Sequence, residues 1–208
     1  MDSLKKDDVR RPFILGVTGG IGSGKSTVCQ VIASFGVPVF YADDEGKRIL
    51  QSDPEAIKEV IEEFGDHSYD ESGVLDRTYL ASVVFNDEQR LRRLNQIVHP
   101  RVRAAFNNFV EENSNSKLVV HESAIIFEAH LDELFDGVVV VDADVDIRLA
   151  RAIAAGKSEG DVRKRMEQQM PAEELRELAD YIVYNNGTFD DLEDEVEVLL
   201  RSLLFLPR

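Results

Sequence analysis

The sequence predicts an α/β fold, in which a parallel sheet of five strands is flanked by helices and carries additional helical lobes. Short apolar runs alternate along the chain with stretches of helical periodicity, a pattern typical of parallel sheets covered on both faces. A glycine-rich turn joins the first apolar run to the first helical stretch. Two of the segments between strands are too long for a single crossover helix. The sequence therefore predicts one core with two inserted helical segments.

The predicted strands are apolar runs bounded by turn residues. The first strand, 13–18, leads through the glycine-rich turn into a helix at about 25–35, which Gly36 ends. The remaining strands are expected at 37–41, 117–121, 137–141 and 181–184. A final helix is predicted from the apolar stripe formed by Leu192, Val196, Leu199, Leu200 and Leu203.

The two inserted segments are both predicted to be helical. In the first, 44–116, helices are expected to begin near Pro54, near Asp76 and at His99–Pro100, where proline would take the first helical position. The second, 147–178, is rich in arginine and lies between two core strands, where a lid can close over phosphates. The prediction for 12–208 is a single unit: a core of 12–43, 117–146 and 179–208, a substrate-binding insert at 44–116 and a lid at 147–178.

Composition limits the partners and the compartment. The formal net charge is −16 at pH 7, which opposes binding to nucleic acid and to anionic membranes. A site for an anionic nucleotide must therefore be locally positive. Cys29 is the single cysteine, so no intrachain disulfide can form and a reducing, cytoplasmic compartment is expected. The first residues do not resemble a signal peptide, and no apolar run is long enough to span a bilayer.

Residues 19–26 read Gly-Gly-Ile-Gly-Ser-Gly-Lys-Ser and match the phosphate-binding P-loop pattern between a strand and a helix. The glycines bring consecutive backbone N–H groups near phosphate oxygens, and the helix directs its positive end at the same anion. Lys25 supplies a positive charge to the outer phosphates, and the Ser26 hydroxyl can ligate Mg²⁺. Thr27 is either a further phosphate contact or an ordinary first-turn residue. The loop predicts an ATP-binding P-loop NTPase core with nucleotide contacts from Gly22, Ser23, Gly24, Lys25, Ser26 and Thr27.

A P-loop alone does not distinguish a kinase from a GTPase or a motor ATPase. The latter two need a magnesium-binding aspartate after an apolar strand and a water-positioning segment. Asp142 follows an apolar run and is compatible with that role, but we favour an ordinary strand-edge aspartate, because the arginine-rich segment follows directly. The chain has no guanine-reading Asn-Lys-x-Asp segment. A short chain with a lobe and a lid favours a small-molecule kinase.

Several separate segments between about Ile14 and Leu200 carry a narrower resemblance. They are Thr-Gly-Gly-Ile-Gly-Ser-Gly-Lys-Ser at 18–26, Tyr-Ala-Asp at 41–43, Leu-Asn-Gln-Ile-Val-His-Pro at 94–100, Glu-Ser-Ala-Ile-Ile-Phe-Glu at 122–128, Arg-Met-Glu-Gln-Gln at 165–169 and Ala-Asp-Tyr-Ile-Val-Tyr-Asn-Asn-Gly at 179–187. In these segments the chain closely resembles the dephospho-coenzyme A kinase family. The resemblance implies phosphorylation of the ribose 3′-hydroxyl of dephospho-coenzyme A by ATP, with Mg²⁺. The products are coenzyme A and ADP, and the reaction is the last step of coenzyme A biosynthesis.

Asp43 is the candidate general base and a candidate substrate contact. It matches the second aspartate of a family Asp-Ala-Asp segment, in which Tyr41 replaces the first. It follows a strand that we expect to adjoin the P-loop strand, at the sheet edge where α/β folds place their chemistry. A carboxylate there can accept the proton of the attacking sugar hydroxyl. The alternative is that Asp43, or Asp44, caps the following helix.

The lid departs most from the family pattern. Arg151 matches the first of two family lid arginines, and with Arg165 it is a candidate for stabilising the transferring phosphoryl group. The alternative for each is a surface ion pair on this acidic protein. Where the family has its second arginine this chain has alanine, and Arg148 or Lys157 are the basic residues that can replace it.

Two further residues have roles implied only by the resemblance. His99 matches a family His-Pro and is either a substrate contact or a helix cap. Asn186 matches a loop near the adenine of ATP and is otherwise part of an ordinary turn. Two rival functions remain: another P-loop nucleoside or nucleotide kinase, and a non-catalytic nucleotide sensor. The set of Lys25, Ser26 and Asp43 argues against the sensor.

Overall fold

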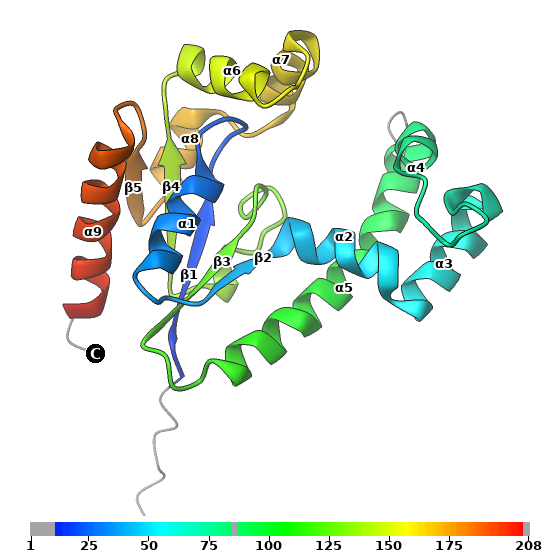
Figure 1. Ribbon diagram of the computed structural model, residues 1–208, viewed down its shortest axis with the longest axis horizontal. Coiled ribbons are helices and arrows are strands. Elements are labelled where there is room, and N and C mark those ends of the chain that lie inside the picture. The colour runs from blue at the N-terminus through cyan, green and yellow to red at the C-terminus, as the bar shows by residue number, and fades with distance from the viewer. Residues whose placement is uncertain (1–10, 85–86, 206–208) are drawn as a thin grey trace, which may run out of the picture. The chain divides into compact units, whose positions relative to one another are not determined.

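The computed structural model describes residues 11–84 and 87–205, and within them it confirms the predicted parallel sheet. The strands lie in the order β2-β3-β1-β4-β5 (Figure 1). β1 pairs in parallel with β3 and β4, and β4 pairs in parallel with β5. Their bounds are β1 Phe13–Thr18, β2 Val39–Tyr41, β3 Leu118–Glu122, β4 Gly137–Asp142 and β5 Tyr181–Tyr184.

The expected position of β2 was wrong. We expected this strand to adjoin the P-loop strand β1, but β3 lies between the two. Parallel strands are joined by long crossovers, so a strand that comes later in the chain can enter the sheet between two earlier ones. The local sequence of a strand does not show which strands will lie beside it in the sheet.

The chain divides into two compact units. The first unit comprises Met1–Phe40 and Val110–Arg208, and the second comprises Tyr41–Phe109. Helices α1 (Lys25–Ser34), α6 (Val145–Ala154), α7 (Glu159–Gln168), α8 (Ala172–Leu178) and α9 (Phe189–Phe205) belong to the first unit. Helices α2 (Ala42–Ser52), α3 (Pro54–Phe64) and α4 (Arg77–Val84) belong to the second, and α5 (Glu88–Glu112) runs from the second into the first.

The sheet of the first unit is covered on both faces. Helices α1 and α9 contact each other and lie in front of the sheet in Figure 1, while α8 lies behind it. On the α8 side, Ile126, Phe127 and Leu175 pack with Val138 and Val140. Because both faces are buried, every residue of β3 and β4 is buried, as expected for a covered parallel sheet.

The second unit is helical and has its own apolar core. Among its members are Ile49 of α2, Val60 and Phe64 of α3, Leu80 of α4 and Ile97 of α5. Two predicted helix starts are confirmed by their caps, because the Asp53 and Asp76 carboxylates accept hydrogen bonds from the Ala56 and Tyr79 N–H groups at 2.9 and 2.8 Å.

The predicted start of a helix at His99–Pro100 was wrong, because α5 passes through Pro100 without ending. The helix begins after Asp87, whose carboxylate accepts hydrogen bonds from the N–H groups of Gln89 and Arg90 at 2.9 and 3.0 Å. Next to the proline, the Arg101 guanidinium donates to the Ile97 carbonyl at 2.7 Å. Proline lacks the N–H that would bond the Gln96 carbonyl, and burial of Ile97 in the second core favours the continuous helix in spite of that loss.

Candidate active site

The P-loop connects β1 to α1 with a backbone that needs glycine at particular points. Gly22 and Gly24 have φ angles of 77° and 96°, values that residues with a Cβ rarely adopt. A Cβ atom at Gly22 would meet the backbone of Arg148, and one at Gly24 would meet the side-chain amide of Asn185. The two glycines therefore allow both the loop conformation and the close approach of its supports.

The predicted nucleotide-binding residues 22–27 run from the loop into the first turn of α1 and differ in exposure. The Lys25 ammonium donates to the carbonyls of Gly19 and Gly20 at 2.6 and 3.3 Å, so it lies folded across the loop. Ser26 is exposed and Thr27 is half-buried. The Ser23 hydroxyl is buried and has no hydrogen-bond partner among the described residues, so this residue presents its backbone.

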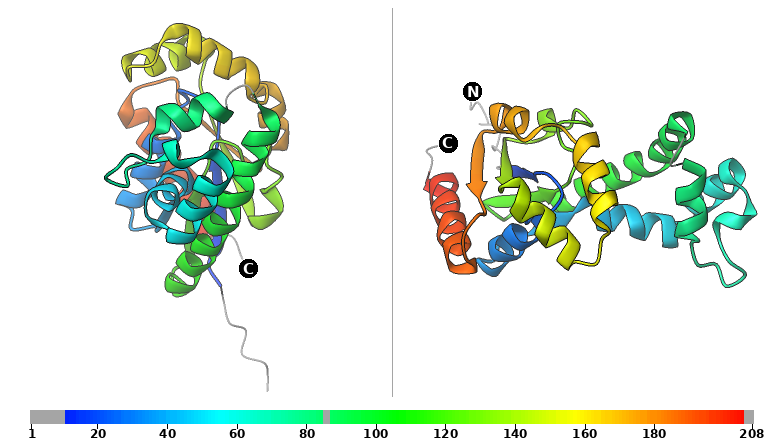
Figure 2. Two further views of the ribbon diagram at one scale, coloured as in Figure 1. Left: turned by 90° about the vertical axis from the view of Figure 1, so that its right-hand side faces the viewer. Right: turned by 90° about the horizontal axis from the view of Figure 1, so that it is seen from above.

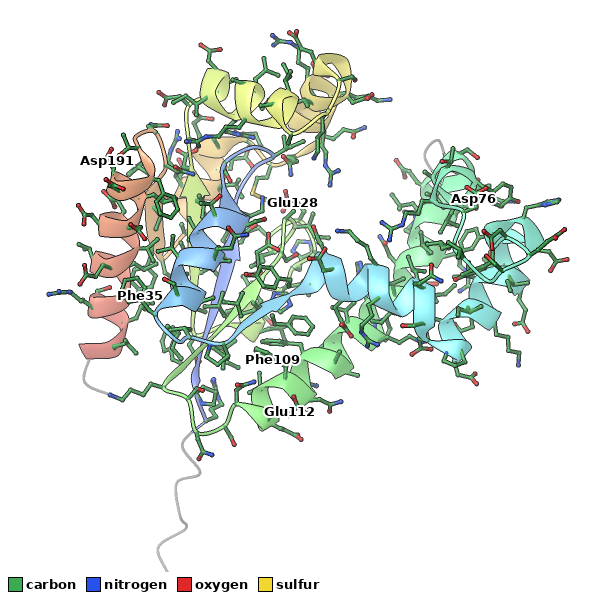
Figure 3. All side chains as sticks on the ribbon, in the orientation of Figure 1. Phe35, Asp76, Phe109, Glu112, Glu128 and Asp191 are labelled. Atoms are coloured by element: carbon green, nitrogen blue, oxygen red, sulfur yellow. The ribbon has the colours of Figure 1, made fainter. Side chains whose placement is uncertain are left out.

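The predicted lid helices pack directly against the P-loop. Ile21 forms a small apolar cluster with Ala152 of α6 and Val162 of α7. The helices α6 and α7 also contact each other (Figure 2). The Ile21 N–H donates to the Gln169 side chain at 2.8 Å. The segment following α7 is also attached to the loop after β3, because the Met170 N–H donates to Glu128, labelled in Figure 3, at 3.3 Å.

Arg148 lies beneath the loop and not on the surface of the lid. Its side chain donates through Nε to the Ile21 carbonyl at 3.0 Å, and the residue is only 8% exposed. Burial lowers the pKa of this guanidinium, and the nearby charge of Asp142 partly opposes that effect. A Cβ at Gly20 would collide with the same guanidinium, so the arginine fills the space under the loop backbone.

Arg151 is held by Asn185. Its Nη1 donates to the Asn185 backbone carbonyl at 2.8 Å, and its Nη2 donates to the Asn185 side-chain oxygen at 3.2 Å. The Asn185 side-chain Nδ2 donates to the Ser23 carbonyl of the P-loop at 2.8 Å. No carboxylate pairs with Arg151 in the described part of the chain, so the surface ion-pair alternative was wrong for this arginine. Arg165 is exposed on α7, and the described residues offer it no ion pair either.

Sequence reasoning missed Asn185 and selected its neighbour Asn186. The Asn186 side chain accepts from the Asp144 N–H at 2.8 Å and donates to the Asp144 carboxylate at 3.2 Å, so it ties the turn after β5 to the turn after β4. The signal for Asn185 lay in the same Asn-Asn-Gly segment. Both asparagines follow β5 directly, and the sequence pattern does not show which of the two side chains faces the loop.

Two acidic residues end the strands on either side of β1. Asp142 of β4 accepts from Arg176 at 2.7 Å and from the Ala143 N–H at 2.9 Å, which agrees with the favoured reading of an ordinary strand-edge residue. Glu122 of β3 pairs in register with Val17 and is 6% exposed. Burial raises the pKa of the Cys29 thiol of α1, and the Glu122 charge raises it further. A buried carboxylate that sequence reasoning missed therefore lies beside the helix that begins at the P-loop.

Asp43 and His99 belong to the second unit. Asp43 is exposed in the first turn of α2, after the N-cap residue Tyr41, and no side chain caps this helix. His99 is exposed in the interior of α5. The capping alternatives for both residues, and for Asp44, which instead pairs with Lys47 at 2.6 Å, were therefore wrong.

The described residues hold neither a metal-binding cluster of acidic, cysteine or histidine side chains nor a membrane-spanning helix. No group of three or more His, Cys, Asp or Glu side chains in residues 11–84 and 87–205 is arranged to hold a metal ion. Within the same ranges, no helix combines the length and the apolar character needed to cross a membrane.

Comparison with known proteins decides the family. The family model described as dephospho-CoA kinase matches residues 13–191, most of the chain. The chain belongs to the dephospho-CoA kinase family. A dephospho-CoA kinase of Chlorobaculum tepidum is 43% identical over 201 residues, covering 94% of this chain and 97% of the relative. A dephospho-CoA kinase of Salinibacter ruber is 46% identical over 181 residues, covering 86% and 91%.

Solved structures share the fold of this chain. A Thermus thermophilus structure superposes with a TM-score of 0.81 at 35% identity, covering 93% of this chain and 98% of that one. A shikimate kinase from Acinetobacter baumannii has a TM-score of 0.52 at 20% identity over 94% of each chain, and shows only that the fold is shared. The predicted class is confirmed: the chain is a phosphotransferase with an alcohol group as acceptor, and the GTPase and nucleotide-sensor alternatives fall away.

Proposed function

We propose that this chain transfers the γ-phosphoryl group of ATP to the ribose 3′-hydroxyl of dephospho-coenzyme A, giving coenzyme A and ADP. This reaction is the last step of coenzyme A biosynthesis. The observation that carries the proposal is the complete P-loop, with Lys25 and Ser26, in a chain matched by the dephospho-CoA kinase family model over residues 13–191. The single cysteine favours a reducing cytoplasm as its compartment.

Phosphate binding rests on groups of the first unit. The loop amides and the start of α1 bind the phosphate oxygens, and Lys25 exchanges its two carbonyl contacts for the outer phosphates. Arg151, which pairs with no carboxylate among the residues that the structure describes, stabilises the negative charge of the transferring group. Asn186 supports the turn beside which the adenine of ATP is expected.

A magnesium ion fits the donors present. Mg²⁺ keeps several waters and is usually held by one or two protein oxygens together with substrate phosphates, so a three-carboxylate cluster is not needed. The exposed Ser26 hydroxyl is the direct ligand that we propose, and the buried Glu122 carboxylate orients water near it. When bound, the ion supplies positive charge to the phosphate oxygens.

The acceptor hydroxyl needs a base and a binding surface. Asp43 is exposed and takes part in no ion pair among the described residues, so its carboxylate is available to accept the hydroxyl proton. His99, exposed on α5, is the proposed acceptor contact. Both residues belong to the helical unit, which we propose recognises dephospho-coenzyme A.

The test is an ADP-release assay of the purified chain with ATP and Mg²⁺. Dephospho-coenzyme A is compared with a nucleoside, a nucleoside monophosphate and shikimate as acceptors. We expect ADP release only with dephospho-coenzyme A, and a 3′-phosphorylated product by mass spectrometry. Preferential phosphorylation of a nucleoside or nucleotide would instead establish the alternative, a different P-loop kinase.

A further inference from the structure

Asn185 is the first residue after β5 and lies at the carboxyl end of the sheet, where the P-loop also begins. The residue is 5% exposed, and its backbone N–H donates to the Asp142 carbonyl at 2.8 Å. Buried side-chain amides are almost always hydrogen-bonded at both ends. Here one end contacts the P-loop and the other contacts the lid.

The two ends of this amide join two parts of the proposed phosphate site. Its Nδ2 donates to the Ser23 carbonyl at 2.8 Å, and its Oδ1 accepts from Arg151 at 3.2 Å. The backbone carbonyl of Asn185 accepts a second Arg151 bond at 2.8 Å. We propose that Asn185 is a positioning residue that fixes the Arg151 guanidinium to the P-loop, so that its charge keeps a set place relative to the phosphate-binding amides. This inference rests on the proposed function of Arg151.

A neutral anchor suits an arginine that must act on a phosphate. A guanidinium has five N–H donors, and the bonds to Asn185 use two of them, so the others stay available for phosphate oxygens. An amide and a carbonyl hold the side chain without cancelling its charge, whereas a carboxylate would cancel it. The nearby Asp142 is already paired with Arg176. Fixing a long side chain in advance also lowers the entropy lost when it engages the transferring group.

The P-loop is shaped to receive this amide. Gly24 is the position at which a Cβ would strike the Asn185 Nδ2, and Ser23 directs its carbonyl toward the same nitrogen. The alternative is that Asn185 merely closes the connection between β5 and α9. A residue with only that role affects stability, and its effect on rate does not depend on Arg151.

A double-mutant cycle separates the two roles. The rate constant kcat and the dissociation constant for ADP are measured for Asn185→Ala, Arg151→Ala and the double variant, with melting temperature recorded for each. We expect Asn185→Ala to lower kcat by about tenfold or more, as for loss of a preorganised charge. In the Arg151→Ala background the same change should cost less than about twofold, since residues acting through one another are non-additive.

Thr188→Ala is the matched control in the same connection. The Thr188 hydroxyl donates to the carboxylate of Asp191, labelled in Figure 3, at 2.7 Å and accepts from the Asp191 N–H at 3.2 Å. These bonds cap α9 and do not involve Arg151. This variant should lower the melting temperature and leave kcat unchanged. Asn185→Ser, which also lacks the amide, replaces the alanine variant where the latter does not fold.

The inference would be overturned if the fold-decrease in kcat of the double variant equalled the product of the two single decreases. A wild-type kcat for Asn185→Ala would also overturn it. The wild-type assay with dephospho-coenzyme A tests the proposed function separately, because it does not involve these variants. If the wild-type chain prefers another acceptor, the double-mutant cycle is measured with that acceptor. The link between Asn185 and Arg151 is then judged by the same comparison of kcat values.

Discussion

Lys25 carries the phosphate-binding role at the scale of a single residue. Its ammonium donates to two loop carbonyls, and its side chain is not part of the apolar core of the described residues. Lys25→Ala should therefore lower kcat by about 100-fold or more while the melting temperature stays near wild type. Lys58→Ala, which removes the same charge from an exposed position on α3, should keep full activity. Near-normal turnover of Lys25→Ala would falsify the assignment.

The proposed base can be tested with a neighbour of the same chemistry. Asp43→Asn keeps the size of the side chain but removes its ability to take a proton, so kcat should fall by about 10²–10⁴-fold. ATP affinity measured without acceptor should change little, because the loop holds the phosphates. Asp44→Asn is the matched control in the same helical turn, since Asp44 is paired with Lys47 at 2.6 Å. Equal rates for the two variants would remove Asp43 from the base role.

Residues of the phosphate-binding loop were easier to predict from the sequence than the residues that support the loop. The P-loop was complete in the sequence because its spacing reflects local backbone geometry. Asn185 and Glu122 were missed, because their importance arises from neighbours more than a hundred residues away, Ser23 for Asn185 and Val17 for Glu122. Such contacts depend on which strands lie side by side, and one sequence does not record that.

At the scale of elements, buried strands were predicted well and helix boundaries less well. The bounds of β5, Tyr181–Tyr184, are those expected, because a short apolar run between turn residues has one plausible register. The start of α5 was misplaced because Pro100 is a strong local signal. The cap at Asp87 and the burial of Ile97 outweigh it, and the second of these is tertiary.

Arg101 supports α5 at the proline, and its removal should weaken the second unit. Besides the bond to the Ile97 carbonyl, its guanidinium pairs with Glu59 at 2.7 Å and Asp53 at 3.6 Å. Arg101→Met keeps the apolar stem and should lower the free energy of unfolding by about 1–2 kcal/mol. The comparison is Arg92→Met on the same helix, whose 3.7 Å pair with Glu88 is exposed and should be worth less than about 0.5 kcal/mol. Urea unfolding of both variants gives the difference, and equal values would contradict the bracing role.

At the scale of the whole molecule, a net charge of −16 must coexist with binding of a polyphosphate. The first unit meets this requirement by gathering Lys25, Arg148 and Arg151 around one loop, where neutral carbonyl and amide groups accept hydrogen bonds from Lys25 and Arg151. Arg148 is also held by a carbonyl, that of Ile21. The positive potential of the site is thus built from three basic side chains brought together around the loop, although the composition is strongly acidic.

The stability of the whole fold should depend on pH through one buried histidine. His121 of β3 is 5% exposed and lies between the rings of Phe40 and Phe135, at centroid distances of 5.4 and 5.2 Å. Burial lowers the pKa of His121 to about 4, whereas in the unfolded chain it is near its ordinary value of 6.5. Between these values the unfolded state binds the proton and the folded state does not. Stability is therefore complete above about pH 6.5 and falls as the pH approaches 4.

The expected loss from this residue is about 2 kcal/mol between pH 7 and pH 5, since each unit of pKa difference corresponds to about 1.4 kcal/mol. Carboxylates also titrate over this range, but they do so equally in wild type and in His121→Phe, which keeps an aromatic ring between Phe40 and Phe135. The free energy of unfolding at the two pH values should thus fall by about 2 kcal/mol less in His121→Phe than in wild type. His67→Gln, at an exposed position, should behave as wild type. Parallel losses in wild type and His121→Phe would mean that the buried ring is not the group that links folding to pH.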